Sequence, residues 1–382
     1  MHYAPISRSA IKKTLFRRDR KQACAGILLS LAAALFAFGG QACAQQAQPQ
    51  FDELAGRAAQ ARDAGNLAQA VELYRQATAQ RPDWQEGWWY LGLLHYSANQ
   101  YQPAVDAFTH LLQLAPQAVP ATALRGLCEY ELAAYDDALR DLELAVAHGA
   151  ASDPRNAQIL RFHLAQLLTR AGRFQNALAQ YEFFATEKVE NPDVDAGIGM
   201  AGMRVAALVS DASSQDRVLY EAAGRAAWPL LAGDSMESEK RFRDLFAQHP
   251  AAQNLHYMFG FLLFPHDPAM AAVEFQRELA IAPDNTTARA MLAFTLMVEG
   301  HYAEARPEAE RALADAPGME MAKIALGRAL AETGEYVRSE QLLKEVLAAD
   351  AENQEARLGL IAIYSHTGRE EEARRERLAM VK

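Results

Sequence analysis

Hydrophobic positions along most of the chain recur at the three- and four-residue spacing of amphipathic helices. These helical stretches are about 12–15 residues long and occur in pairs, with a short turn inside each pair. The turns read Gly-Asn-Leu at 65–67, Gly-Arg-Phe at 172–174, Gly-His-Tyr at 300–302 and Gly-Glu-Tyr at 334–336. Glycine supplies the positive φ that ends the first helix of a pair. The pattern predicts an all-α protein.

The helix pairs return with a period of 34 residues. Three sets of residues keep this spacing: Gly65, Asn99 and Ala133; Ala70, Ala104 and Ala138; Gly300, Gly334 and Gly368. A single helix pair buries too little apolar surface to stand alone, so neighbouring pairs must share one continuous core. The sequence therefore predicts an α-solenoid of stacked antiparallel helix pairs.

The repeat resembles that of the tetratricopeptide repeat (TPR) family, whose helix pairs form a superhelix. The unit that starts at residue 85 carries the resemblance best, through Trp88, Leu91, Gly92, Tyr101, Ala104, Phe108 and Pro116. The family's small residue at the eighth position of a unit is present as Ala58, Gly92, Gly126, Ala165, Ala226, Gly260, Ala293 and Gly327. Its small twentieth residue is Ala70, Ala104, Ala138, Ala177, Ser238, Ala305, Ser339 and Ala373. Small residues at these positions let two helices approach closely.

The resemblance divides the chain into two repeat blocks. Repeats one to four occupy residues 51–191, and repeats five to nine occupy residues 219–382. The last helix, around residues 370–377, is highly charged, as the solvated cap of a solenoid should be. Residues 192–218 have no clear partner 34 residues away, and we expect an irregular helix and linker there.

The first 44 residues have the pattern of a secretory signal peptide. Six basic residues between 12 and 21 precede an uncharged apolar stretch from Gly26 to Gly40, and Ala42-Cys43-Ala44 fits a small-x-small cleavage site. We expect cleavage after Ala44 and a periplasmic or secreted protein without a stable membrane span. The alternatives are an uncleaved anchor, a twin-arginine signal at Arg17-Arg18 and lipidation of Cys43.

Charge and motif content exclude several classes of function. The full chain has a net charge of −10, and removal of residues 1–44 makes it −16, so nucleic acid is a poor partner. The sequence contains no phosphate-binding loop, nucleophile elbow or metal-binding helix motif, so we expect no enzyme activity, no cofactor and no metal. Cys128 would be the one remaining cysteine, and we expect it to be buried.

One glycine motif matches a dinucleotide-binding pattern by its letters alone. Gly197, Gly199 and Gly202 spell G-x-G-x-x-G, but that fingerprint needs a buried strand directly before it. Here residues 190–195 read as a turn and a helix start. The prediction is a close contact between two helices.

The TPR resemblance implies a concave groove lined by the second, fifth, ninth and twelfth residues of each first helix. Mapped onto this sequence, the apolar members of that surface are Trp89, Leu93, Tyr96, Tyr130, Phe162, Tyr257, Phe261, Phe264 and Phe294. We expect Trp89 and Tyr96 on the open side, because Trp88 and Leu91 take the packing positions of the same helix. An aromatic groove suits an amphipathic helix or an extended apolar peptide, although the same aromatics could pack internally.

The resulting hypothesis is a non-catalytic protein–protein interaction scaffold, exported to the periplasm or cell envelope, that binds a protein or peptide in the concave groove. One alternative is an enzyme or small-molecule carrier with a site inside the superhelix, which would need converging titratable groups. A second alternative is self-assembly into a homo-oligomer.

Overall fold

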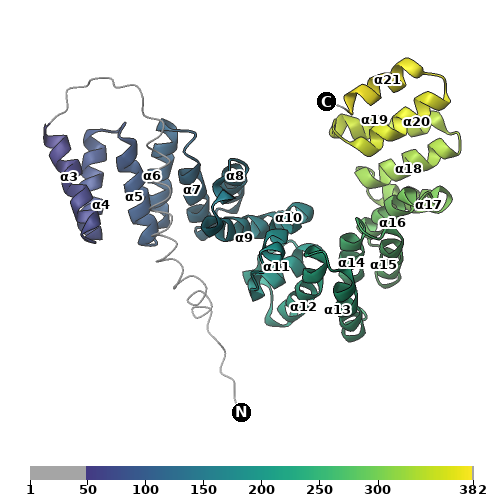
Figure 1. The fold of residues 1–382 in the computed structure, drawn as a ribbon, viewed down its shortest axis with the longest axis horizontal. Coiled ribbons are helices and arrows are strands. Elements are labelled where there is room, and N and C mark those ends of the chain that lie inside the picture. Colours follow the sequence, from purple (N-terminus) through teal and green to yellow (C-terminus); the bar gives the residue numbers. More distant parts are fainter. Residues whose placement is uncertain (1–48, 381–382) are drawn as a thin grey trace, which may run out of the picture. The chain divides into compact units, whose positions relative to one another are not determined.

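The structure is a computed structural model that describes residues 49–380. Within this range the chain consists of helices and turns and contains no strand. It divides between Phe183 and Phe184 into two compact units, which are described separately (Figure 1). The prediction of an all-α solenoid of helix pairs is confirmed. The expected signal peptide, residues 1–44, lies outside the described residues.

The first unit is built from successive antiparallel helices. Its elements are α3 (Pro49–Asp63), α4 (Leu67–Gln80), α5 (Gln85–Ser97), α6 (Tyr101–Leu114), α7 (Val119–Glu131), α8 (Tyr135–Ala147), the 3₁₀ turn η2 (Ala150–Ser152) and α9 (Pro154–Arg170). The boundary between the units falls within α10 (Phe174–Thr186). Helices α3 and α4, α5 and α6, and α7 and α8 pack as pairs, and each of these pairs contacts the next along the chain.

The second unit continues the same arrangement. Its elements are α11 (Pro192–Gly202), the 3₁₀ turn η3 (Val209–Asp211), α12 (Ser214–Leu231), α13 (Ser235–Gln248), α14 (Leu255–Leu263), α15 (Pro268–Ile281), α16 (Thr286–Val298), α17 (Tyr302–Asp315), α18 (Glu320–Glu332), α19 (Tyr336–Ala349), α20 (Gln354–His366) and α21 (Glu370–Ala379). The segment 192–218, expected to be an irregular helix and linker, thus includes the regular helix α11.

The small residues predicted from the repeat lie where the helices of a pair touch. In the second repeat, a Cβ atom on Gly92 would lie 2.5 Å from Phe108 Cε1, so the missing side chain is the space that the ring fills. In the eighth repeat, a Cβ on Gly327 would lie 2.8 Å from Leu343. Where the facing small residue is serine, its hydroxyl is satisfied: Ser339 Oγ donates to the Gly327 carbonyl at 2.5 Å. At this contact the two helices therefore approach closely while the serine hydroxyl keeps a hydrogen bond.

The turns inside the pairs use left-handed backbone. Gly65 has φ 77° and Gly334 has φ 81°, as the turn pattern predicts. In the second and third repeats the same turn position is held by Asn99 (φ 57°) and Ala133 (φ 60°). Alanine is strained in this region because its Cβ crowds the following carbonyl.

Helices α11 and α12 make a close backbone contact in the second unit. A Cβ on Gly199 would lie 2.0 Å from the Tyr220 carbonyl oxygen, and one on Gly224 would lie 1.9 Å from the Asp195 carbonyl oxygen. Helix α11 begins at a turn in which the Asn191 side chain accepts from the Asp193 amide. The predicted helix–helix contact at the G-x-G-x-x-G motif is confirmed for Gly199.

Candidate functional site

An aromatic cluster forms on the first helices of two successive pairs in the second unit. Helix α14 contributes Tyr257 and Phe261, Phe264 directly follows α14 as its C-cap, and helix α16 contributes Phe294. The Tyr257 and Phe261 rings stack with centroids 6.1 Å apart, and the Phe264 and Phe294 rings lie 5.7 Å apart. Tyr257 is buried, whereas the three phenylalanines are half-buried. The cluster therefore offers apolar surface that its own packing leaves partly uncovered.

A buried carboxylate positions the helix that carries most of this cluster. Glu278 on α15 is fully buried, and its two oxygens accept from the backbone amides of Asn254 at 2.7 Å and Tyr257 at 3.2 Å. These amides lie at the N-terminus of α14, where the first turn of a helix leaves its N–H groups without internal partners. A carboxylate there is also favoured by the helix dipole. Glu278 thereby fixes the start of α14.

The concave-face residues predicted in the first unit have mixed environments. Leu93 is buried, while Tyr96, Tyr130 and Phe162 are half-buried. Tyr130 lies edge-on to His163, with ring centroids 4.6 Å apart. The Tyr130 hydroxyl also donates to Gln166 at 3.4 Å. Tyr130 therefore already contacts neighbouring side chains of the same chain, which leaves less of its surface for a binding partner.

The expectation that Trp89 faces the open side is wrong. Its side chain is only 2% exposed, and its ring lies 5.9 Å from Phe108. The physical reason is Gly92, one turn further along α5: because it has no side chain, Phe108 reaches across α5 to Trp89. Trp88 is the less buried of the two tryptophans and stacks on His110 at 4.4 Å.

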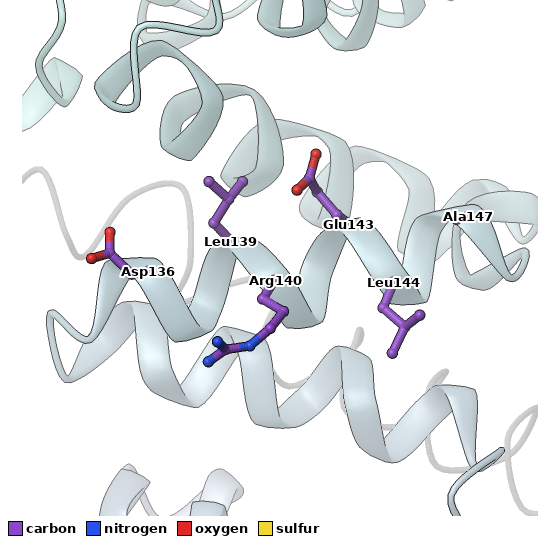
Figure 2. A pocket seen from close by; sticks show the side chains of 6 residues that line it. All are labelled: Asp136, Leu139, Arg140, Glu143, Leu144 and Ala147. Carbon is purple, nitrogen blue, oxygen red and sulfur yellow. The ribbon is translucent and has the colours of Figure 1, made fainter. Parts of the chain in front are cut away.

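A shallow hollow of about 470 Å³ runs along α8. Figure 2 shows its six lining residues along this one helix: Asp136, Leu139, Arg140, Glu143, Leu144 and Ala147. Arg173 pairs with Glu143 at 2.7 Å, so part of the charge is neutralised locally. With lining residues from a single helix among the described part of the chain, the hollow lacks the converging walls of a ligand pocket.

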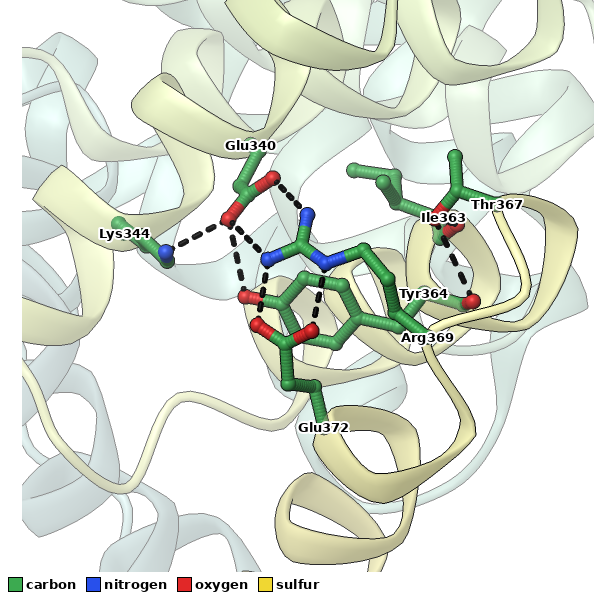
Figure 3. Close-up of polar contacts among 7 residues, drawn as sticks. All are labelled: Glu340, Lys344, Ile363, Tyr364, Thr367, Arg369 and Glu372. Atoms are coloured by element: carbon green, nitrogen blue, oxygen red, sulfur yellow. Dashed lines mark hydrogen bonds and ion pairs between the residues drawn. The ribbon is translucent and has the colours of Figure 1, made fainter.

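Helices α19, α20 and α21 are joined by a charged network (Figure 3). Glu340 accepts from Lys344 at 2.6 Å, from Arg369 at 2.6 Å and from the Tyr364 hydroxyl at 3.2 Å. Arg369 also donates to Glu372 at 2.6 Å. The Arg369 guanidinium, followed by Lys344, lowers the pKa of Glu340 to about 2. The last helix, predicted as a solvated cap, is thus also tied to the preceding pair.

One half-buried carboxyl group has a pKa well above its ordinary value. Burial first, and Asp141 second, raise the pKa of Glu129 on α7 to about 7, while Arg125 opposes them. Asp141 accepts from Arg125 at 2.6 and 2.9 Å, whereas Oε2 of Glu129 is buried without a hydrogen-bond partner. The adjacent Cys128 is buried, and desolvation raises the pKa of its thiol to about 12. That thiol is therefore poorly suited to nucleophilic chemistry.

The described residues offer no arrangement for metal chemistry. No group of three His, Cys, Asp or Glu side chains within residues 49–380 could hold a metal ion. No described helix is both long and apolar enough to cross a membrane.

Sequence comparison identifies the repeat directly. Models of the tetratricopeptide repeat match residues 55–119 and residues 330–376. No curated protein matches the sequence.

Similar solved structures include three proteins of low sequence identity. A tetratricopeptide repeat protein from Parabacteroides merdae is 16% identical, covers 74% of this chain and all of its own, with a TM-score of 0.32. Yeast Tom70 is 12% identical over 83% of this chain and 80% of its own, with a TM-score of 0.31. YrrB, a TPR protein with an unusual peptide-binding site, is 15% identical over 75% of this chain and 97% of its own, with a TM-score of 0.24.

The helix pairs and their small contact residues define a helical-repeat solenoid. More narrowly, each unit contains a stretch, residues 55–119 in the first and 330–376 in the second, that matches the tetratricopeptide repeat. This fold points to a protein–protein interaction scaffold, and proteins of this kind are generally not catalytic.

Proposed function

We propose that the protein is an exported scaffold that holds a peptide segment of a partner protein against the aromatic cluster of α14 and α16. The observation that carries the proposal is the pair Phe264 and Phe294, which are half-buried with ring centroids 5.7 Å apart. Aromatic side chains supply much of the energy at protein interfaces. Partly exposed rings on successive first helices offer anchors for an apolar peptide.

The supporting geometry lies wholly within the second unit. Phe261 and Phe294 stand on helices whose other faces are packed, since Met258, Phe259 and Met291 are buried, and Phe264 directly follows the first of these helices. A rigid helix with one uncovered aromatic edge loses little conformational entropy when it binds. The fully buried Glu278 adds to this rigidity at the start of α14.

A displayed random-peptide library, selected on the purified protein, tests the proposal. We expect enrichment of peptides with two or more large apolar residues. Replacing Phe264 and Phe294 together by alanine should weaken those peptides at least about tenfold, in line with the loss of an interface anchor. Val337→Ala, at an 87% exposed residue of α19, is the matched control and should leave affinity unchanged. If the double variant and the parent protein bound the peptides with equal affinity, peptide binding at the aromatic cluster would be refuted.

Export is the second part of the proposal and rests on residues 1–44. The charged start, short apolar stretch and Ala42-Cys43-Ala44 site support cleavage after Ala44. The intact mass of protein recovered from the envelope or medium should correspond to a chain that begins at Gln45. A full-length chain retained in the cytoplasm would contradict export without affecting the peptide-binding test.

A further inference from the structure

Helices α14 and α16, which carry the aromatic cluster, pack mainly through α15, the helix between them in the chain. A direct polar link joins their N-terminal ends. Asn285, the N-cap residue of α16, donates through Nδ2 to Oδ1 of Asn254, the N-cap residue of α14, at 2.9 Å. The two helices of the aromatic cluster are therefore tied at their starts by a hydrogen bond between side chains.

The fully buried Glu278 completes this link. Its Oε1 atom accepts from the Asn254 amide at 2.7 Å and from Asn285 Nδ2 at 3.3 Å. Its Oε2 atom accepts from the Tyr257 amide at 3.2 Å. Both asparagines are half-buried, and a hydrogen bond shielded from water is electrostatically stronger than one in water. Asn254, Glu278 and Asn285 together are called the clasp below.

Each asparagine also has a local role that can be separated from the link. Asn254 has φ 63°, in the left-handed region that glycine and asparagine tolerate best, and its side chain makes no cap hydrogen bond to α14. Asn285 Oδ1 accepts from the Ala288 amide at 3.0 Å, a capping bond that a serine hydroxyl can also accept. Glycine at position 254 and serine at position 285 therefore keep the turn and the cap but remove the link.

The clasp and the ring pair lie at different ends of the two helices. Phe264 follows Asn254 by ten residues and Phe294 follows Asn285 by nine, which corresponds to about 14–15 Å along a helix. At that distance the Phe264 and Phe294 rings contact each other, with centroids 5.7 Å apart. Because a helix moves as a stiff rod, a small tilt of α16 at the clasp becomes a larger displacement at the rings.

We propose that Asn285 is a positioning residue of the peptide site: through the clasp it holds α16 at a fixed angle to α14 and so presets the separation of the Phe264 and Phe294 rings. This inference rests on the peptide site proposed above and assigns the residues that hold it in its binding geometry. A preset site loses less conformational freedom on binding, so opening the clasp lowers the affinity although both rings remain.

Asn254→Gly and Asn285→Ser open the clasp from its two sides. The probe is a fluorescein-labelled copy of the displayed-library peptide that binds the parent best. Fluorescence anisotropy should show about two- to tenfold weaker binding for each variant, the effect of one hydrogen bond. The double variant should bind no more weakly than Asn285→Ser, because both changes remove the same bond. An additive loss would instead reveal two unrelated structural defects and would contradict the clasp.

Asn353→Ser is the matched control for these variants. Asn353 caps α20 by accepting from the Ala356 amide at 2.9 Å, and its Nδ2 donates to Glu320 on α18 at 2.7 Å. The same substitution there keeps a capping oxygen and removes an equivalent link between two first helices outside the aromatic cluster. We expect it to retain the parent affinity for the labelled peptide.

A second readout needs no peptide. In free protein with isotope-labelled phenylalanine rings, the nuclear Overhauser effect between Phe264 and Phe294 should weaken in both clasp variants and persist in Asn353→Ser. Parent-like affinity of the clasp variants would overturn the positioning role and leave the peptide site intact. Weaker affinity with an unchanged ring contact would overturn it as well, because the loss would not arise from the ring separation. If the parent selected no peptide, the peptide site and this role would both fail.

Discussion

Replacing Gly199 by alanine adds one methyl group at a point where the backbones of α11 and α12 are in close contact. The added Cβ would lie 2.0 Å from the Tyr220 carbonyl oxygen, and real Cβ atoms essentially never come within 3.0 Å of a heavy atom outside their own residue and its chain neighbours. The two backbones must therefore move apart by at least 1.0 Å. Because the obstacle is backbone, no side-chain rotation can relieve it.

The expected cost is up to about 2 kcal/mol of unfolding free energy. Overpacking of this kind costs about 1–3 kcal/mol or more, and the better helix propensity of alanine returns up to about 1 kcal/mol. Gly56→Ala is the matched control, since Gly56 is exposed within α3 and its added Cβ would meet nothing within 4 Å. There the same chemical change should stabilise the protein by about 0.5–1 kcal/mol.

Urea unfolding followed by far-ultraviolet circular dichroism measures both effects, and hydrogen exchange localises them. Gly199→Ala should lower the transition midpoint and speed exchange in α11 and α12, whereas Gly56→Ala should raise the midpoint. Gly224→Ala, whose Cβ would lie 1.9 Å from the Asp195 carbonyl oxygen, should act like Gly199→Ala. If Gly199→Ala matched Gly56→Ala instead, the inferred backbone contact would be wrong.

Three further predictions concern other single positions. Ala133→Gly should stabilise the protein by up to about 1 kcal/mol, because residue 133 has φ 60°, whereas Gly334→Ala at φ 81° should destabilise it by about 1 kcal/mol; thermal unfolding of the two variants checks both signs. The pKa of Glu129, raised to about 7, gives stability that is full below its ordinary value of 4.5 and is lost as pH rises through 7. Glu129→Gln should therefore flatten the change in urea midpoint between pH 5 and pH 8. Glu278→Ala should cost about 3 kcal/mol in urea unfolding, since it leaves two backbone amides at the start of α14 without their charged acceptor, and Glu278→Gln should cost less.

Much of the packing could be predicted because it repeats. Ala70, Ala104 and Ala138 are each completely buried, as their spacing indicates. A repeated contact demands the same small residue in every unit, so the requirement is visible in the sequence without coordinates. The turn glycines are predictable for a similar local reason, since a positive φ is costly for other residues.

The candidate site was less predictable. The repeat positions predicted both Trp89 and Phe261 on the concave surface of their helices, yet Trp89 is buried and Phe261 is half-buried. The difference comes from Phe108 and Gly92, which bring a second helix against Trp89. The hollow of about 490 Å³ between α15, α16 and α17 was not expected from the sequence.

The sequence by itself determined the helix pairs, their 34-residue repeat and the small residues at which paired helices touch, because these depend on neighbours at fixed separations along the chain. Only the tertiary structure decided which aromatic rings are covered and where a hollow forms between α15, α16 and α17. Burial depends on the volume that side chains of other helices fill. Glu278 illustrates the point: nothing in its local sequence indicates that a glutamate on α15 is buried at the start of α14, because two of its partners are backbone amides more than 20 residues away.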